Sequence, residues 1–206
     1  MFVLFAQVAA VLFVIRLVLF VILHLIPGGI HPVRDTVSDY AASTSPVTRV
    51  LSTCSSWAAA AGWAALGVSV LTEPEFGASR EGVGIWLIVL AAVLMIMPWV
   101  PTDGPGQRTT VRGRVHLLLA VAWFTIAYST IGPLGRLLGA AGISGPADLL
   151  SVLNVIAMIA LIALVVSLIV RPLKSRTFGV SERVFILVVT LAPLVASLGI
   201  AGIVGG

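Results

Sequence analysis

The chain has 206 residues, of which 59% are hydrophobic and 10% charged, and its mean hydropathy is +1.15. A soluble domain carries about 45–50% apolar and about 25% charged residues. This composition excludes a water-soluble globule and a disordered chain, and the single cysteine, Cys54, excludes a disulfide scaffold. The class of protein that remains is an integral membrane protein with little mass outside the bilayer.

The net charge of +4 and the pI near 10.2 are compatible with nucleic acid as a partner. However, the 12 basic residues are scattered over short loops and form no basic stripe interleaved with aromatic residues. We therefore expect no nucleic-acid partner, and we attribute the positive balance to membrane orientation.

A helix needs about 20 mainly apolar residues to cross a bilayer. Six segments satisfy this requirement, and none shows the period-2 alternation of a membrane barrel. These segments are residues 2–26, 48–71, 83–100, 114–132, 147–170 and 183–204. We predict an all-α integral membrane protein, with six transmembrane helices in one bundle and a single domain over residues 1–206. The first segment is too long for a signal peptide and lacks a basic start, so we expect a retained span.

Turn and cap residues predict where these helices end. Gly132-Pro133 is expected to end the fourth helix, and residues 133–144 are expected to form a short interfacial helix. Ser38 and Ser181, each followed by an acidic residue, have the chemistry of helix N-caps.

The distribution of Lys and Arg predicts the orientation. The first, third and fifth loops carry nine of these residues, whereas the other side has only Arg80 and Arg136. Because positively charged short loops stay in the cytoplasm, we expect these three loops to be cytoplasmic and both termini to lie outside.

Polar residues from three distant segments gather at this predicted cytoplasmic side. Arg guanidinium groups beside hydroxyl groups suit a phosphate or a lipid headgroup. The candidates for binding a lipid or a partner are Arg34, Asp35, Ser38, Asp39, Tyr40, Asp103, Arg112, His116, Glu182 and Arg183. The alternative is structural: the same residues cap helices, form turns and meet anionic headgroups as determinants of topology.

Three of these candidates carry an enzymatic alternative. His116, Asp103 and Asp39 have the groups to polarise a water molecule beside a lipid headgroup. The sequence contains neither a GxSxG nor an HExxH motif, so no catalytic residue is assigned, and no metal or cofactor is expected.

Arg16 lies deep inside a predicted span, whereas the other arginines within spans lie at span ends. It lies roughly 12 Å from the cytoplasmic end of the first helix, at about 1.5 Å per residue. The groups expected level with it are hydroxyls and a thiol, among them Cys54, Ser55 and Ser56. A charge at this depth indicates a substrate pathway, a structural contact inside the bundle, or a contact with a partner subunit.

Four short motifs occur in order along the chain. They are Arg34-Asp35-Thr-Val-Ser38-Asp39-Tyr40, Pro101-Thr102-Asp103, Gly113-Arg-Val-His116 and Ser181-Glu182-Arg183. Their order over nearly the whole chain resembles the prokaryotic six-helix membrane family catalogued as domain of unknown function nine-nine-eight. The Ser-Asp element with the following Pro46 is also distantly similar to the Frag1/DRAM/Sfk1 membrane proteins. The first resemblance implies six helices and a cytoplasmic-side signature, but no activity, and Arg16 matches none of its motifs.

These observations favour a non-enzymatic protein of the bacterial plasma membrane that binds lipid. It would act alone, as an accessory subunit of a larger membrane complex, or as a homo-oligomer. The alternatives are a small-solute or lipid transporter, with Arg16 on the pathway, and a lipid-headgroup hydrolase or transferase using His116, Asp103 and Asp39.

Overall fold

The computed structural model describes residues 1–26, 29–104 and 108–202, without the side chains of residues 171, 174 and 175. Its long elements are α1 (Phe2–Leu25), α2 (Pro46–Thr72), α3 (Ser79–Ile96), α4 (Val111–Ala140), α5 (Ser144–Ile169) and α6 (Arg171–Ala201). Each contains a stretch long and apolar enough to cross a membrane, and the described residues include no strand. The predicted all-α class with six spans is confirmed.

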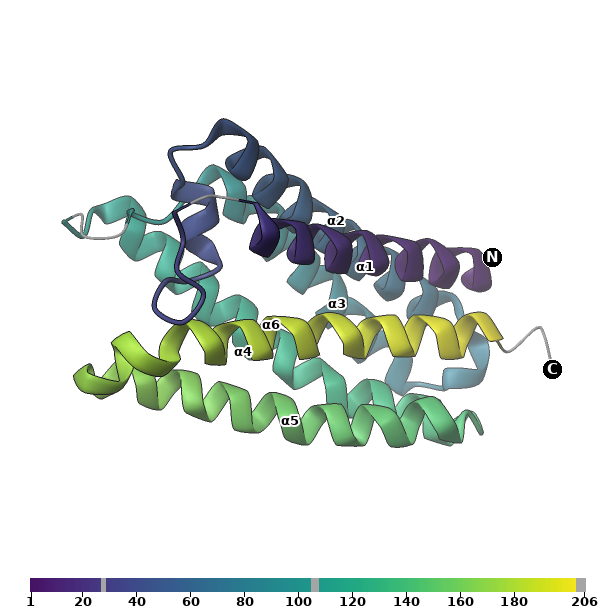
Figure 1. Ribbon diagram of the computed structural model, residues 1–206. Helices are drawn as coiled ribbons and strands as arrows, with labels where there is room; N and C mark the ends of the chain where they lie inside the picture. The colour runs from purple at the N-terminus through teal and green to yellow at the C-terminus, as the bar shows by residue number, and fades with distance from the viewer. Residues whose placement is uncertain (27–28, 105–107, 203–206) are drawn as a thin grey trace.

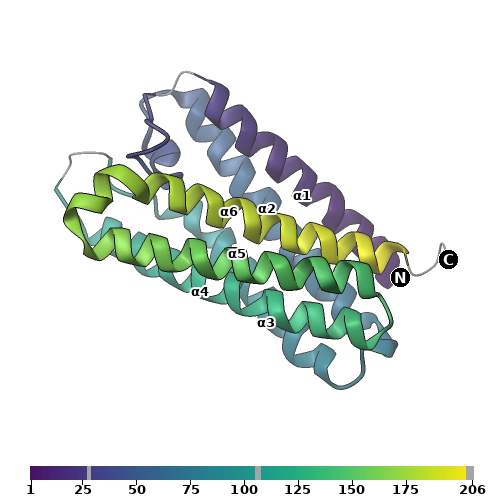
Figure 2. The same cartoon turned by 60° about the horizontal axis from the view of Figure 1, so that its bottom comes forward.

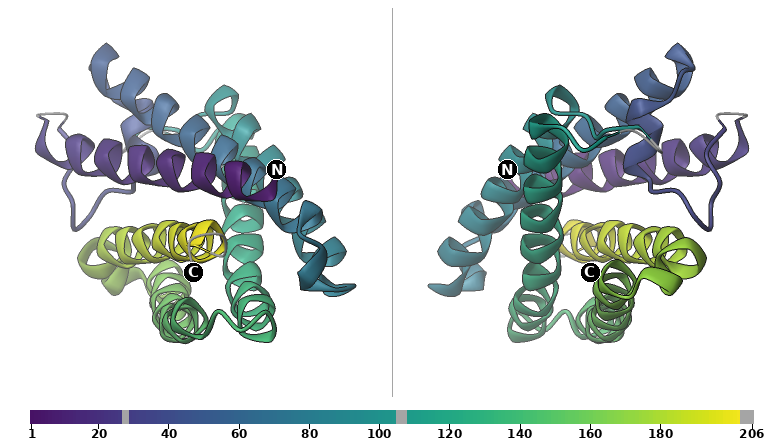
Figure 3. Two further views of the ribbon diagram at one scale, coloured as in Figure 1. Left: turned by 90° about the vertical axis from the view of Figure 1, so that its right-hand side faces the viewer. Right: turned by 90° about the vertical axis from the view of Figure 1, so that its left-hand side faces the viewer.

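Helices that follow one another in the chain pack side by side (Figures 1 and 2). α6 also packs against α1, and α3 against α4, so the six helices close into one bundle. Figure 3 shows α5 and α6 nearly end-on, on one side of α4. The start of α1 and the end of α6 lie at the same end of the bundle, as an even number of crossings requires (Figure 1).

The helices divide into central and peripheral ones. α2 and α6 bury 56% and 61% of their most apolar stretch inside the protein, whereas α1, α3 and α5 each bury 28%. The outer face of α1 carries exposed aliphatic side chains such as Leu4, Val11 and Val18, and α5 carries Val152 and Ile159 in the same way. An apolar outer surface of this kind is what a lipid-facing helix requires.

The predicted end of the fourth helix at Gly132-Pro133 is wrong. α4 continues through Pro133 to Ala140, and the chain turns at Gly142, which has a φ of +79°. Proline removes one backbone hydrogen bond, a loss that neighbouring helices can compensate in a membrane bundle. Ile131 and Leu134, on either side of the proline, are buried in the core and hold the helix in place. The interfacial helix expected over residues 133–144 is therefore the last part of α4.

The beginning of the sixth helix also differs from its prediction. α6 starts at Arg171 rather than residue 183, with Pro172 in its first turn, where a missing N–H group costs nothing. Ser181 therefore lies inside the helix and is not an N-cap. Ser38 is not one either: it begins the short 3-10 helix η1 (Ser38–Ala42) without a side-chain cap. The observed caps are Ser45 for α2 and Thr110 for α4. The expected end of the last span, at residue 204, lies outside the described residues.

Candidate functional site

The first loop packs against the N-terminal half of α6. The backbone N–H of Gly179 donates to the carbonyl oxygen of Val33 at 3.2 Å. The buried carboxylate of Glu182 accepts a hydrogen bond from the backbone N–H of Val37 through Oε2 at 2.8 Å. A Cβ on Gly179 would come within 2.8 Å of the Val33 oxygen, so only glycine allows this approach. The first and last motifs of the sequence thus form one contact.

Arg183 strengthens the same contact from within the bundle. Its Nη1 donates to the carbonyl oxygens of Asp35 at 2.7 Å and Gly179 at 3.0 Å. Its Nε donates to Nε2 of His24 at 2.8 Å, and its guanidinium carbon lies 6.0 Å from the centre of the Tyr40 ring. Although Arg183 is charged, it is only 9% exposed, and it faces the protein instead of a headgroup layer.

η1 and the turn before it are held by carboxylates. Oδ2 of Asp39 accepts from the backbone N–H of Thr36 at 2.6 Å, and Oγ1 of Thr36 accepts from the N–H of Asp39 at 3.1 Å. Burial raises the pKa of the Asp39 carboxyl above its usual range, against the lowering effect of the Thr36 hydrogen bonds. Asp35 accepts from the backbone N–H of His31 at 2.7 Å.

Asp103 holds the N-terminus of α4. Its Oδ1 accepts from the hydroxyl of Thr110 at 2.7 Å, and its Oδ2 accepts from the backbone N–H of Thr110 at 2.8 Å. The Thr110 hydroxyl in turn accepts from the N–H of Gly113 at 3.1 Å and caps the helix. Hydrogen bonds from the side chain and the backbone of Thr110 lower the pKa of the Asp103 carboxyl. Because Gly113 has no Cβ, the carboxylate of Asp103 can lie directly against it.

His116 and Arg16 are buried polar residues with unused hydrogen-bonding atoms. His116 Nδ1 lies 2.6 Å from the carbonyl oxygen of Val100; because a carbonyl only accepts, Nδ1 is the donor. Its Nε2 is buried and has no partner. Arg16, which is 6% exposed, donates through Nη1 to Oγ of Ser55 at 2.6 Å, while its Nε is buried without a partner. The expected hydroxyl partner of Arg16 is confirmed in Ser55.

A cavity of about 60 Å³ lies between these residues. A site for one water molecule needs about 10–15 Å³ on this measure, so the cavity has room for several. The cavity is lined by side chains that carry a charge or a polar aromatic ring, namely Arg16, His116, Trp123 and Glu182. Residues with hydroxyl groups also line it, namely Ser38, Ser52, Thr53 and Ser56. Trp123 adds a further unpartnered group, the buried indole Nε1.

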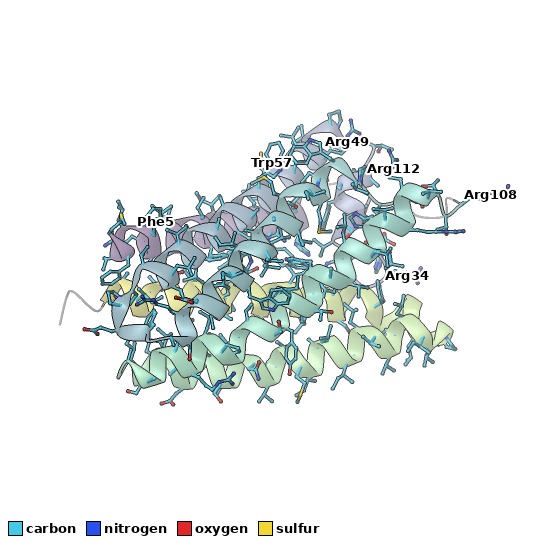
Figure 4. The ribbon with its side chains drawn as sticks, turned by 180° about the vertical axis from the view of Figure 1, so that it is seen from behind. Phe5, Arg34, Arg49, Trp57, Arg108 and Arg112 are labelled. Carbon is cyan, nitrogen blue, oxygen red and sulfur yellow. The ribbon has the colours of Figure 1, made fainter. Side chains whose placement is uncertain are left out.

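The structure thus separates the candidate residues into three groups. Ser38, His116 and Glu182 line the cavity together with Arg16. Asp35, Asp39, Tyr40, Asp103 and Arg183 hold the loops and helix ends around it, through the contacts described above. Arg34 and Arg112 are exposed. Figure 4 shows them at the same end of the protein as Arg49 and Arg108, with Phe5 toward the other end.

The three residues of the enzymatic alternative point to different partners. His116 is bonded to Val100, Asp103 to Thr110 and Asp39 to Thr36. Within the described part of the chain, no group of three or more His, Cys, Asp or Glu side chains is placed to hold a metal ion. The bonds of His116, Asp103 and Asp39 each order the backbone of a loop or a helix end.

Sequence reasoning missed Trp123, Thr110 and the bond between Arg183 and His24. Trp123 could have been found, because His116, Ala120 and Trp123 have the i, i+4, i+7 spacing of one helix face, and all three line the cavity. Thr110 lies just before α4 and caps this helix. Nothing in the sequence links His24 to Arg183, which lies 159 positions away.

A family model described as "Protein of unknown function (DUF998)" matches residues 7–199. The chain is a multi-pass helical membrane protein and belongs to this family, as the order of its four motifs predicted. No curated protein and no solved structure matches it. These comparisons do not show the weaker likeness to the Frag1/DRAM/Sfk1 proteins, which stays a prediction.

Proposed function

We propose that this protein lies in a bacterial plasma membrane and binds anionic lipid at its polar end, without catalysing a reaction. The exposed arginines Arg34, Arg108 and Arg112 carry the proposal. Arg34 comes from the first loop, Arg108 from the segment before α4, and Arg112 from the first turn of α4. All three lie at one end of the bundle (Figure 4). A guanidinium group pairs with phosphate through two parallel hydrogen bonds, which suits it to a phospholipid headgroup.

The orientation in the membrane follows from the same arginines. The connections between α1 and α2, between α3 and α4, and between α5 and α6 share this end. Most of the positive charge lies in these connections or in the helix residues that follow them, including the N-terminal half of α6. We propose that this end is cytoplasmic, where the leaflet is anionic and attracts Arg by about 1 kcal/mol per residue. Both termini then lie outside.

Lipid retention tests the headgroup contact. The chain is purified from native membranes in mild detergent, and bound lipid is measured by native mass spectrometry. The double variant Arg34→Gln/Arg112→Gln is expected to retain anionic phospholipid about thirtyfold less well, since each arginine contributes about 1 kcal/mol. The matched control is Arg136→Gln, an exposed arginine in the last part of α4, near the opposite end. Equal retention by all variants contradicts lipid binding and favours an accessory subunit whose polar end contacts protein.

Transport is the second candidate, and the cavity is the observation that favours it. A transporter with Arg16 on its pathway requires a polar space that reaches Arg16, and the cavity lined by Arg16, His116 and Glu182 is such a space. Solute-dependent flux into proteoliposomes, present with the native chain and absent with Arg16→Gln, would favour transport over lipid binding alone.

A further inference from the structure

Within the described part of the chain, the guanidinium group of Arg16 forms no ion pair. Its one hydrogen bond goes to the neutral hydroxyl of Ser55, and its Nε has no partner. Among residues 1–26, 29–104 and 108–202, no carboxylate forms an ion pair with it. Buried charges are normally paired, because removing a charge from water is costly unless an opposite charge lies nearby. Among these residues, Arg16 therefore has no carboxylate in direct contact, although Glu182 lines the same cavity.

The cavity beside Arg16 offers further groups to an anion. Trp123 lines it and is 5% exposed, and its indole N–H, which can only donate, has no partner. His116 lines it at 6% exposure. Because its Nδ1 donates to Val100, the unpartnered Nε2 accepts from a protonated ligand oxygen when the ring is neutral and donates when the ring is charged.

We propose that this cavity binds a phosphate or carboxylate group, with Arg16 and Trp123 donating to its oxygens. The guanidinium supplies the opposite charge, the indole adds a neutral donor, and His116 faces the protonated oxygen. This site goes beyond the headgroup contacts of Arg34 and Arg112, which lie outside the cavity lining. The bound group belongs either to a lipid headgroup or to a free small anion, and both present the same oxygens.

The effect of replacing Glu182 distinguishes two explanations of the cavity. Its carboxyl group lines the same cavity and is 4% exposed, and its Oε2 is occupied by the N–H of Val37. If Glu182 is instead the water-bridged counter-charge of Arg16, Glu182→Gln should destabilise the protein and leave anion binding absent. If the cavity takes an external anion, Glu182→Gln removes a negative charge beside it and should tighten binding.

The experiment measures thermal stability of the purified full chain against anion concentration. One arm uses delipidated protein in uncharged detergent with inorganic phosphate or acetate, and sodium chloride at matched ionic strength is the reference. The other arm uses nanodiscs of phosphatidylcholine with or without phosphatidic acid. Stabilisation by phosphate or acetate in detergent identifies a free anion, and stabilisation by phosphatidic acid alone identifies a lipid headgroup.

Three variants decide whether the effect comes from the cavity. Arg16→Gln should weaken anion binding about tenfold to a hundredfold, because it removes a charged donor. Trp123→Phe keeps the ring contacts with Phe124 and Phe185 but loses the N–H, so binding should weaken about threefold to tenfold. Trp63→Phe is the matched control, since Trp63 is equally buried but lies outside the cavity lining, and its anion response should equal that of the native chain.

Two results would overturn the proposal. One is a native chain that none of these anions stabilises. The other is a stabilisation that Arg16→Gln and Trp123→Phe leave unchanged, which would assign the anion to another surface. Loss of lipid retention in Arg34→Gln/Arg112→Gln tests the proposed function separately, because that variant keeps the cavity and should keep its phosphate response.

Discussion

Arg183 donates through Nε to Nε2 of His24 at 2.8 Å, which joins the N-terminal half of α6 to the last turn of α1. The other ring nitrogen, Nδ1, lies 2.6 Å from the carbonyl oxygen of Phe20 and must donate to it. His24 is therefore neutral, with its proton on Nδ1, and it is an acceptor for a buried cation. This bond joins the first and the last helix of the bundle at its polar end.

Arg183→Gln should lower the stability of the bundle. The variant loses the bonds to His24, Asp35 and Gly179, at a cost of roughly 2–4 kcal/mol, and Tm should fall by about 5 °C or more. His24→Phe keeps an aromatic ring beside Phe20 and removes only the acceptor, so the fall should be smaller. Differential scanning fluorimetry in detergent measures both. Exposed Arg114→Gln is the control, and an equal fall there would mean that charge, not these bonds, is responsible.

Gly113→Ala should loosen the start of α4. Alanine normally stabilises a helix by about 0.5–1 kcal/mol relative to glycine. At residue 113, however, the added Cβ would take the place of the Asp103 carboxylate, which must then leave Thr110. Amide hydrogen exchange in the first turn of α4 should become faster. Gly82→Ala in α3 adds a Cβ where no atom lies within 4 Å, so it should be neutral or stabilising; similar behaviour of the two variants would contradict the role of Asp103.

Asp103 should stabilise the protein at neutral pH and lose this effect in acid. Its folded-state pKa is lowered, so its contribution is present above the unfolded value, about 3.9, and is lost as the pH falls through the folded value. The Tm of Asp103→Asn should lie below that of the native chain at pH 7, and the gap should close below about pH 4. A gap that persists unchanged in acid would show that the charge of Asp103 is not involved.

Asp39 should show the opposite pH dependence. Burial raises its folded-state pKa, so its contribution is greatest in acid and is lost as the pH rises through the folded value. Asp39→Asn keeps an oxygen for the N–H of Thr36 and removes the buried charge. Relative to the native chain, the Tm of this variant should therefore improve as the pH rises from 4 to 8. A difference that is constant over this range would contradict the shifted pKa.

The orientation is open to a direct measurement. A reporter that is active only outside the cytoplasm, fused after Gly206, should be active, and one fused within the first loop after Arg34 should be inactive. The excess of arginine and lysine in the first, third and fifth loops is the reason. Activity with the opposite pattern would place the exposed arginines outside and contradict the proposed cytoplasmic headgroup contact.

The six spans could be predicted from the sequence because the bilayer fixes both the length and the polarity of a crossing helix. Their ends could not be, since tertiary contacts decide them. Buried Ile131 and Leu134 carry α4 past Pro133, and the contact of Gly179 with Val33 lies in a part of α6 that the hydropathy pattern left out. Turn chemistry is local, whereas these contacts join distant segments.

The site was predicted in part for the same reason. Arg16 was a candidate because charges deep in a span are scarce, and His116 and Glu182 were candidates as polar residues of the predicted cytoplasmic side. The structure brings the three to one cavity. Whether a charged side chain faces lipid or protein depends on the rotation of its helix. Arg112 and Arg183 look alike in the sequence, yet the first is exposed and the second is buried against His24.

The contact of the first loop with α6 also restricts how the cavity can be reached. Glu182 and Arg183 bond to the backbone of Val37 and Asp35 and hold the first loop against α6, beside the cavity. The lining of the cavity also includes Thr53 and Ser56 of α2, Met97 and Pro98 after α3, and Ala120 of α4. Exchange of the cavity contents on the side of the first loop would require this loop to separate from α6 and break the bonds of Glu182 and Arg183.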